Sequence, residues 1–98
     1  MTVYVDTLRA VLADNPRWPW PSSCHLYADS LEELHGFARR LQMRRTWFQP
    51  DLSLPHYDLT AARRERAIKA GAVEVTGRQM VEWVRERRTH DTSLQTLQ

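Results

Sequence analysis

Four side chains of types that transfer protons or bind metal ions interrupt the apolar stretches of this sequence: Asp6, His25, His56 and Asp58. Asp6 ends one apolar run, His25 lies inside another, and the other two lie just before a helix-forming segment. Buried polar groups need hydrogen-bond partners, so three such interruptions favour a shared site over isolated packing. Imidazoles and carboxylates could act there as acid and base, or hold a divalent metal ion with a position left open for water.

His56 and Asp58 stand two positions apart. On a β-strand both side chains therefore point to one face of the sheet, and Tyr57 points to the opposite face. Open α/β folds bind ligands where strands end, so we expect the four polar side chains to meet at strand ends along one edge of the sheet. We predict that His25, His56, Asp58 and Asp6 are catalytic residues.

A structural role for the same residues stays open at this point. His56 and Asp58 could brace the helix that begins at Thr60, and Asp6 could accept backbone amides in the turn after the first strand. No His-Glu-x-x-His or Cys-x-x-Cys motif occurs, and with 3 glycines the chain has no glycine-rich phosphate loop. The spacing thus permits a divalent metal cofactor without identifying one.

Arginines cluster in three helix-forming segments, and the arginine fork matches the paired oxygens of phosphate and carboxylate groups. We predict that Arg63 and Arg64, in the first turn of the helix from Thr60, bind an anion together with the free amides there. We also predict that Trp47 and Tyr57 contact this ligand. The alternative is that the arginines lie on solvated helix faces.

Residues 17–21 are an arginine followed by alternating tryptophans and prolines, which excludes a helix interior or a central strand. Trp18 and Trp20 are hard to bury in such a loop, and they could cover a site, face a partner or stack on a nucleobase. No recognised nucleic-acid motif accompanies them, and the formal net charge is only +2. The ligand that we expect is therefore a phosphate-bearing small molecule, with a nucleic acid as the less supported partner.

Length and composition predict a single folded domain. The chain has 98 residues, of which 42% are hydrophobic and 27% charged, as in ordinary globular proteins. No apolar run approaches the roughly 20 residues that span a bilayer, and no secretion signal is visible, so we expect no membrane association and a cytoplasmic location. Cys24 is the only cysteine, which excludes an intrachain disulfide, and its apolar flanks favour burial over catalysis.

Hydrophobic spacing and capping residues predict alternating strands and helices. The clearest helix begins after Ser30, where Ser30–Glu33 forms a capping box, and a second capping box spans Thr76–Gln79. The expected strands cover residues 2–5, 23–28, 46–49, 56–59 and 72–75, and the expected helical segments cover residues 7–13, 31–42, 60–71 and 77–88.

This alternation predicts an α/β fold, with a small mixed sheet of about four or five strands covered by two or three helices in a single layered domain. The helix from Thr60 lies between two strands and suggests a crossover with at least one parallel strand pair. We assign residues 1–88 to this domain and residues 89–98 to a polar, disordered tail.

The motifs taken together resemble a known family, the small bacterial and phage proteins catalogued as domain of unknown function 4031. The resemblance covers roughly Thr2 to Arg88. It rests on these segments in this order: Val3-Tyr4-Val5-Asp6, the helix start from Asp29 to Glu33, Leu34-His35-Gly36-Phe37-Ala38, Trp47-Phe48-Gln49, His56-Tyr57-Asp58 and Ala67-Ile68-Lys69-Ala70-Gly71-Ala72.

The resemblance implies a compact domain but no reaction. It implies that the recurring polar and aromatic positions of the family fall here on Asp6, His25, Trp47, His56, Tyr57 and Asp58. The loop between Asp6 and His25 is longer here than in the family and could shape or cover a site.

Two functional hypotheses follow. The first is a small hydrolase or transferase, metal-dependent or using acid and base, that acts on a phosphate-bearing or nucleotide-like ligand. The second is a non-catalytic binding or adaptor protein that uses the same surface for a protein or nucleic-acid partner. We also expect a homodimer, because Trp18, Trp20 and Trp83 exceed what a small core hides.

Overall fold

The sheet is organised around β3 (Ser22–Ala28), its longest strand. In the computed structural model of the chain, which describes residues 2–11 and 16–96, β1 (Val3–Val5) and β4 (Tyr57–Leu59) both pair with β3 in antiparallel orientation. Leu26 is paired with a residue of β1 and with a residue of β4, so these two strands lie along opposite edges of β3. The strand that carries His25 is therefore central.

Two shorter strands complete the sheet. β5 (Val73–Glu74) pairs with β1 in parallel, which confirms the predicted parallel pair. β2 (Arg9–Ala10) pairs in antiparallel orientation with the first residues of β3. The described residues thus form a mixed sheet of 5 strands accompanied by three α-helices, as the sequence predicted.

Capping residues set the starts of the first two helices. α1 (Leu31–Arg40) begins after Ser30, whose hydroxyl accepts a hydrogen bond from the amide of Glu33. α2 (Ala61–Lys69) begins after Thr60, whose hydroxyl accepts one from the amide of Arg63. Both hydroxyls satisfy amides that have no partner within the helix.

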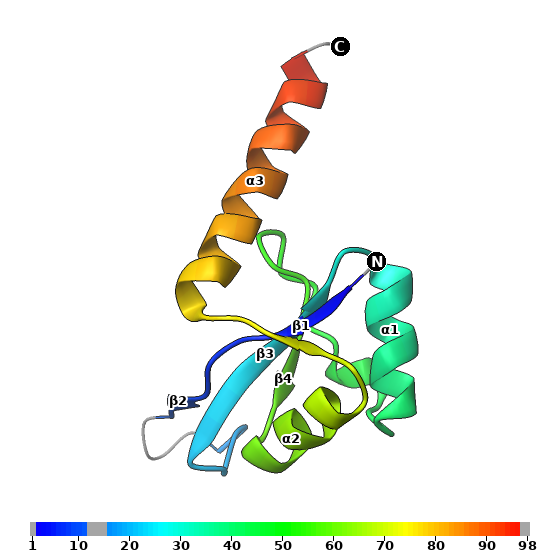
Figure 1. Cartoon of the computed structure of the whole chain (residues 1–98), viewed down its shortest axis with the longest axis vertical. Helices are drawn as coiled ribbons and strands as arrows, with labels where there is room; N and C mark the ends of the chain where they lie inside the picture. The colour runs from blue at the N-terminus through cyan, green and yellow to red at the C-terminus, as the bar shows by residue number, and fades with distance from the viewer. Residues whose placement is uncertain (1, 12–15, 97–98) are drawn as a thin grey trace.

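α3 (Gly77–Thr96) follows the predicted capping box, in which Thr76 and Gln79 exchange two hydrogen bonds of 2.8 and 3.0 Å. The helix rises away from the sheet (Figure 1). It continues past Thr89, so it is longer than the sequence predicted. The domain boundary at residue 88 and the disorder of the tail stay predictions.

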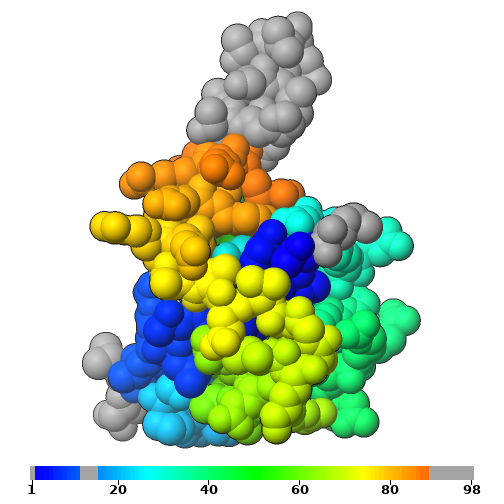
Figure 2. Space-filling view, in the orientation of Figure 1, coloured from blue at the N-terminus to red at the C-terminus, as the bar shows by residue number. Residues whose placement is uncertain are grey.

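One face of the sheet carries the main apolar core. Val5, Leu26 and Leu59 are fully buried there, and α1 and α2 cover this face (Figure 1). α2 and the segment that leads through β5, coloured yellow-green to yellow, form much of the molecular surface in Figure 2. The two helices thus seal this face from solvent.

The opposite face of the sheet is divided into two parts. Tyr4 and Tyr27 stack on it with ring centroids 5.0 Å apart, and Trp83 of α3 packs edge-on against Tyr27. Because side chains alternate along a strand, Asp6 shares the face of Tyr4, and His25 shares the face of Tyr27. The polar residues therefore lie beside this aromatic cluster, on the face that α1 and α2 leave uncovered.

Two predicted elements were wrong. Residues 7–13 were expected to be helical, but Arg9 and Ala10 form β2 because they pair with Ser22 and Ser23, a contact that local spacing cannot reveal; residues 12–13 lie outside the described residues. Residues 46–49 were expected to be a strand, but the chain forms a 3-10 turn at Arg45–Trp47. In that segment Gln49 alone forms a β-bridge, with His56.

Among the residues that the structure describes, no helix combines the length and the apolar character that crossing a bilayer requires.

Candidate functional site

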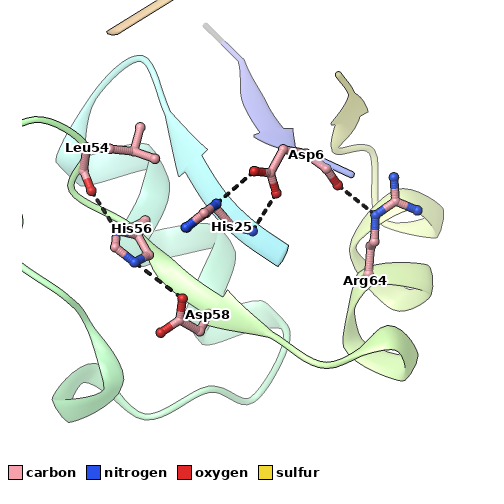
Figure 3. Close-up of polar contacts among 6 residues, drawn as sticks. All are labelled: Asp6, His25, Leu54, His56, Asp58 and Arg64. Atoms are coloured by element: carbon pink, nitrogen blue, oxygen red, sulfur yellow. Dashed lines mark hydrogen bonds and ion pairs between the residues drawn. The ribbon is translucent and has the colours of Figure 1, made fainter. Parts of the chain in front are cut away.

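Asp6 holds His25 by two hydrogen bonds (Figure 3). One carboxylate oxygen accepts the backbone amide of His25 at 2.6 Å, and the other lies 2.7 Å from ring atom Nδ1. Asp6 is fully buried, and its own amide donates to the His25 carbonyl, which continues the pairing of β1 with β3. The His25 ring is thus fixed in orientation, and no hydrogen bond to its Nε2 atom occurs among the residues that the structure describes.

His56 is held in an equivalent way from the opposite side. Its Nδ1 atom lies 2.6 Å from the carbonyl oxygen of Leu54, and its Nε2 atom lies 3.3 Å from a carboxylate oxygen of Asp58. The backbone of His56 exchanges two hydrogen bonds with Gln49, of 2.8 and 3.1 Å, just before β4 begins. The bridge fixes the position from which the imidazole projects.

Strand pairing brings the two halves together. His25 and Asp58 are directly paired across β3 and β4, and the rings of His25 and His56 meet edge to face with centroids 4.7 Å apart. Potential ligand atoms of His25, His56 and Asp58 all lie within 4.8 Å of one another. The three groups could therefore hold one metal ion or act jointly on one proton.

Two residues of the site, Asp6 and His56, have pKa values shifted from their usual ones. Burial alone would raise the pKa of Asp6, but the hydrogen bonds from the ring and the amide of His25 outweigh it and lower the pKa. Burial alone would lower the pKa of His56, but its hydrogen bonds to Asp58 and to the Leu54 carbonyl raise it. The raised pKa of His56 favours its protonated ring next to the Asp58 carboxylate.

A pocket of about 590 Å³ adjoins this cluster. Trp18 and Trp20 form one part of its wall, with ring centroids 4.7 Å apart, and the indole of Trp18 donates a hydrogen bond to the carbonyl of Ser22. His56 and Asp58 also line the pocket, whereas His25 lies next to it. The lining residues are Val11, Arg17, Trp18, Trp20, Ser23, Thr46, Trp47, Gln49, His56, Asp58 and Arg63.

The two arginines predicted to bind an anion point to different places. Arg63 lines the pocket and stacks over Trp47 at 4.9 Å from the ring centroid. Its Nε atom is buried and has no hydrogen-bond partner among the described residues. Arg64 instead donates from Nε to the backbone carbonyl of Asp6 at 2.9 Å (Figure 3). Its guanidinium also lies 3.4 Å from the Glu74 carboxylate. Arg64 thus supports the Asp6 backbone rather than lining the pocket.

The sequence prediction can be compared residue by residue. Asp6, His25, His56 and Asp58 do come together, although on a face of the sheet rather than, as we predicted, at strand ends along one edge of the sheet. Tyr57, predicted to contact the ligand, lies on the other face. It is buried there, with its hydroxyl 2.9 Å from Nδ1 of the His35 ring.

Two contributors to the site were missed by sequence reasoning. They are the Leu54 carbonyl, which orients His56, and Gln49, which bridges to His56 and lines the pocket. A backbone carbonyl leaves no signal in residue type. Gln49 could have been suspected only from its place beside Trp47 in the motif Trp47-Phe48-Gln49.

Comparison with known proteins identifies one related group. A family model described as protein of unknown function (DUF4031) matches residues 11–87. The matched range includes His25, His56 and Asp58 and begins after Asp6. Neither the curated proteins nor the solved structures provided a match.

Proposed function

This chain belongs to the DUF4031 family of proteins of unknown function, and we propose that it is a small hydrolase or transferase acting on a phosphate-bearing, nucleotide-like ligand. The single observation that carries the proposal is the meeting of His25, His56 and Asp58 beside a pocket whose wall includes His56 and Asp58. Groups that can exchange protons or bind a metal ion converge there from two strands. Their position beside a cavity gives them access to a substrate.

The walls of the pocket support the choice of ligand. Trp18, Trp20 and Trp47 provide aromatic surfaces on which a planar base can stack. Arg63 brings a cation, and its buried Nε–H group has no acceptor among the described residues. A phosphate oxygen is the kind of acceptor that a guanidinium binds most strongly. A volume of about 590 Å³ is within the usual range for small-molecule sites.

The proposed reaction transfers a phosphoryl group to water or to another hydroxyl group. The attacking oxygen forms a bond to phosphorus, and the bond between phosphorus and the leaving oxygen breaks, with its electron pair moving to that oxygen. The His25, His56 and Asp58 cluster accepts the proton of the attacking O–H group and returns a proton to the leaving oxygen. Arg63 stabilises the charge on the phosphoryl oxygens.

A second candidate function is a binding or adaptor protein. It is favoured by one observation: Trp20 and Trp47 are 45% and 38% exposed, and Arg63 stacks over the Trp47 ring. Exposed aromatic side chains next to a guanidinium could recognise a partner without chemistry. The two candidates differ in whether a bound ligand is turned over.

The test uses tag-free protein and a panel of nucleoside mono-, di- and triphosphates and phosphodiesters. Product formation is followed by chromatography, in one series with Zn²⁺ or Mn²⁺ and in another with a chelator. We expect turnover of at least one substrate, and a loss of about 100-fold or more in His56→Gln.

The matched control is His35→Gln, because His35 is a histidine on the opposite face of the sheet. This variant should retain activity within about twofold of wild type. An absence of turnover across the panel, or equal losses in both variants, would overturn the enzymatic proposal. Binding of a partner without turnover would support the adaptor function instead.

A further inference from the structure

We propose that His25, His56 and Asp58 form a binding site for one divalent first-row transition-metal ion of the zinc type, coordinated by the two Nε2 atoms and one carboxylate oxygen. The inference deepens the proposed function and rests on it for its catalytic meaning. Metal binding itself can be measured without any substrate, so the two proposals can fail separately.

The first argument concerns the other nitrogen of each ring. Nδ1 of His25 faces the Asp6 carboxylate, and Nδ1 of His56 faces the Leu54 carbonyl. A carbonyl oxygen can only accept, and the Asp6 carboxylate, which already accepts the backbone amide of His25 through its other oxygen, acts as an acceptor toward the ring as well. Each Nδ1 atom must therefore carry the proton. In the neutral rings the lone pairs are then on Nε2, as is typical of metal-ligating histidines whose second nitrogen is bound by a carboxylate or a backbone carbonyl.

The second argument concerns the space between His56 and Asp58. The Nε2 atom of His56 and the carboxylate oxygen lie 3.3 Å apart and attract each other only through a cation between them, which is either the Nε2 proton of the charged ring or a metal ion that replaces it. Two ligand atoms that each lie about 2.0–2.1 Å from a tetrahedral zinc ion are roughly 3.3–3.4 Å apart. The observed separation matches that geometry better than it matches a strong charge-assisted hydrogen bond, which is usually about 2.7–2.9 Å long.

The third argument concerns the positioning of the ligands. His25 and Asp58 lie on paired strands, and the backbone of His56 is fixed by its bridge to Gln49. The upper separation of 4.8 Å within the cluster exceeds a tetrahedral edge. A pair of ligand atoms at this upper separation must therefore approach by about 1.4 Å on binding to reach the tetrahedral edge of roughly 3.4 Å, which a side-chain rotation can supply without any change in the sheet.

The donor set indicates the class of metal. Two imidazoles and one carboxylate suit zinc, iron, cobalt or manganese, whereas magnesium and calcium prefer oxygen ligands alone. Three protein ligands leave at least one coordination position for water, which is the pattern of catalytic rather than structural zinc sites. The side chains of His25 and Asp58 are about one-third exposed, at 30% and 32%, so an ion and a water molecule can reach the site.

The metal would supply the activation that the proposed function requires. Bound water loses its proton more readily next to a divalent cation. The carboxylate oxygen of Asp58 that does not bind the metal can accept this proton. The site lies at the wall of the pocket that Arg63 also lines, so a phosphoryl group held by Arg63 would face the activated water.

The experiment is a calorimetric titration of chelator-treated, tag-free protein with Zn²⁺, Co²⁺ and Mg²⁺. In parallel, the visible absorption of the Co²⁺ complex reports nitrogen and oxygen ligation. We expect one equivalent of Zn²⁺ or Co²⁺ per chain, at least about 100-fold tighter than Mg²⁺. We expect His25→Gln, His56→Gln and Asp58→Asn each to weaken binding by about 100-fold or more, and His35→Gln to leave it unchanged.

The result is interpreted only for variants whose circular dichroism matches wild type. Two results would overturn the metal site. One is that wild type binds no metal ion, and the other is that a correctly folded variant binds the ion with unchanged affinity. Metal binding without turnover would support the metal site and contradict the proposed enzymatic function. Turnover that continues in the presence of a chelator, by a protein that binds no metal ion, would overturn the metal site. It would support a reaction catalysed by acid and base alone.

Discussion

Asp6 forms two hydrogen bonds with His25, one with the backbone amide at 2.6 Å and one with ring atom Nδ1 at 2.7 Å. The carboxylate that does so is fully buried between β1 and β3. A buried carboxylate of this kind is costly unless its oxygens are satisfied, and here both oxygens are. The contact therefore fixes the ring, and with it the direction of Nε2.

Replacing Asp6 by asparagine tests this positioning role. The amide oxygen of Asp6→Asn can still accept the His25 backbone amide, but its NH₂ group would donate to Nδ1. The proton of His25 would then move to Nε2, which blocks metal ligation. We expect zinc affinity to fall about 10- to 100-fold with little change in secondary structure, as measured by calorimetry and circular dichroism.

Asp29→Asn is the matched control for this change, because Asp29 accepts hydrogen bonds from the Thr2 amide and the Tyr4 hydroxyl away from the site. It should leave zinc affinity unchanged even if it lowers stability. An equal loss of affinity in both variants would show that Asp6 acts through general stability and not through the His25 tautomer.

Removing the Arg63 guanidinium should weaken ligand binding in a phosphate-dependent way. Charge-assisted hydrogen bonds contribute about 1.5–3 kcal/mol, so we expect a nucleotide to bind Arg63→Ala about 10- to 100-fold more weakly, while a nucleoside without phosphate loses little. Tryptophan fluorescence would report both affinities, because Arg63 stacks on Trp47.

Arg66→Ala serves as the control in this comparison, since Arg66 is exposed on the same helix. Its nucleotide affinity should match wild type. If the nucleotide and the nucleoside lost affinity equally in Arg63→Ala, the arginine would be acting by packing on Trp47 and not by binding phosphate.

The thiol of Cys24 should be unreactive in the folded protein. It is 2% exposed on the face opposite His25, and burial together with the nearby charge of Asp6 raises the pKa of its thiol to about 12. At pH 8 the thiolate is therefore almost absent, and thiol reagents should react only after unfolding. Rapid labelling of the native protein, followed by mass spectrometry, would contradict this assignment, as would loss of turnover in a folded Cys24→Ala variant.

His35 should make stability depend on pH. Burial, followed by the charge of Arg45, lowers the pKa of His35 in the folded state. The unfolded chain then binds more protons, so the contribution of this residue is fully present above about pH 6.5 and is lost as the pH falls through the lowered folded value.

Urea unfolding of wild type and His35→Gln between pH 8 and pH 5 measures this contribution. The stability advantage of wild type should shrink as the pH falls. An advantage that grew toward pH 5 would mean that the hydrogen bond with Tyr57 favours the charged ring.

Residues that act through local rules were predictable from the sequence. Ser30 and Thr60 cap their helices as expected, and Gly71 follows α2 with a φ of 111°, a conformation that favours glycine. The two-residue spacing of His56 and Asp58 correctly placed both on one face, opposite Tyr57. These features depend on spacing along one element.

Features that depend on contacts between distant segments were not predictable. β2 exists because Arg9 and Ala10 meet the start of β3 across a loop, which overrides the helical spacing of the apolar residues around them. Trp47 has strand propensity but lies in a 3-10 turn, exposed and stacked under Arg63. The register of β3 and β4, which pairs His25 with Asp58, likewise cannot be deduced from one sequence.

The central claim is that the Nε2 atoms of His25 and His56 meet Asp58 in one site and bind a metal ion there in place of a proton. The most direct measurement is long-range ¹H–¹⁵N NMR of the imidazole rings, before and after addition of one equivalent of Zn²⁺. We predict that both rings then carry their proton on Nδ1 and that Nε2 of His25 and of His56 shifts while the His35 ring does not. A proton on Nε2 of either ring in the presence of Zn²⁺, or no shift at these atoms, would contradict the account.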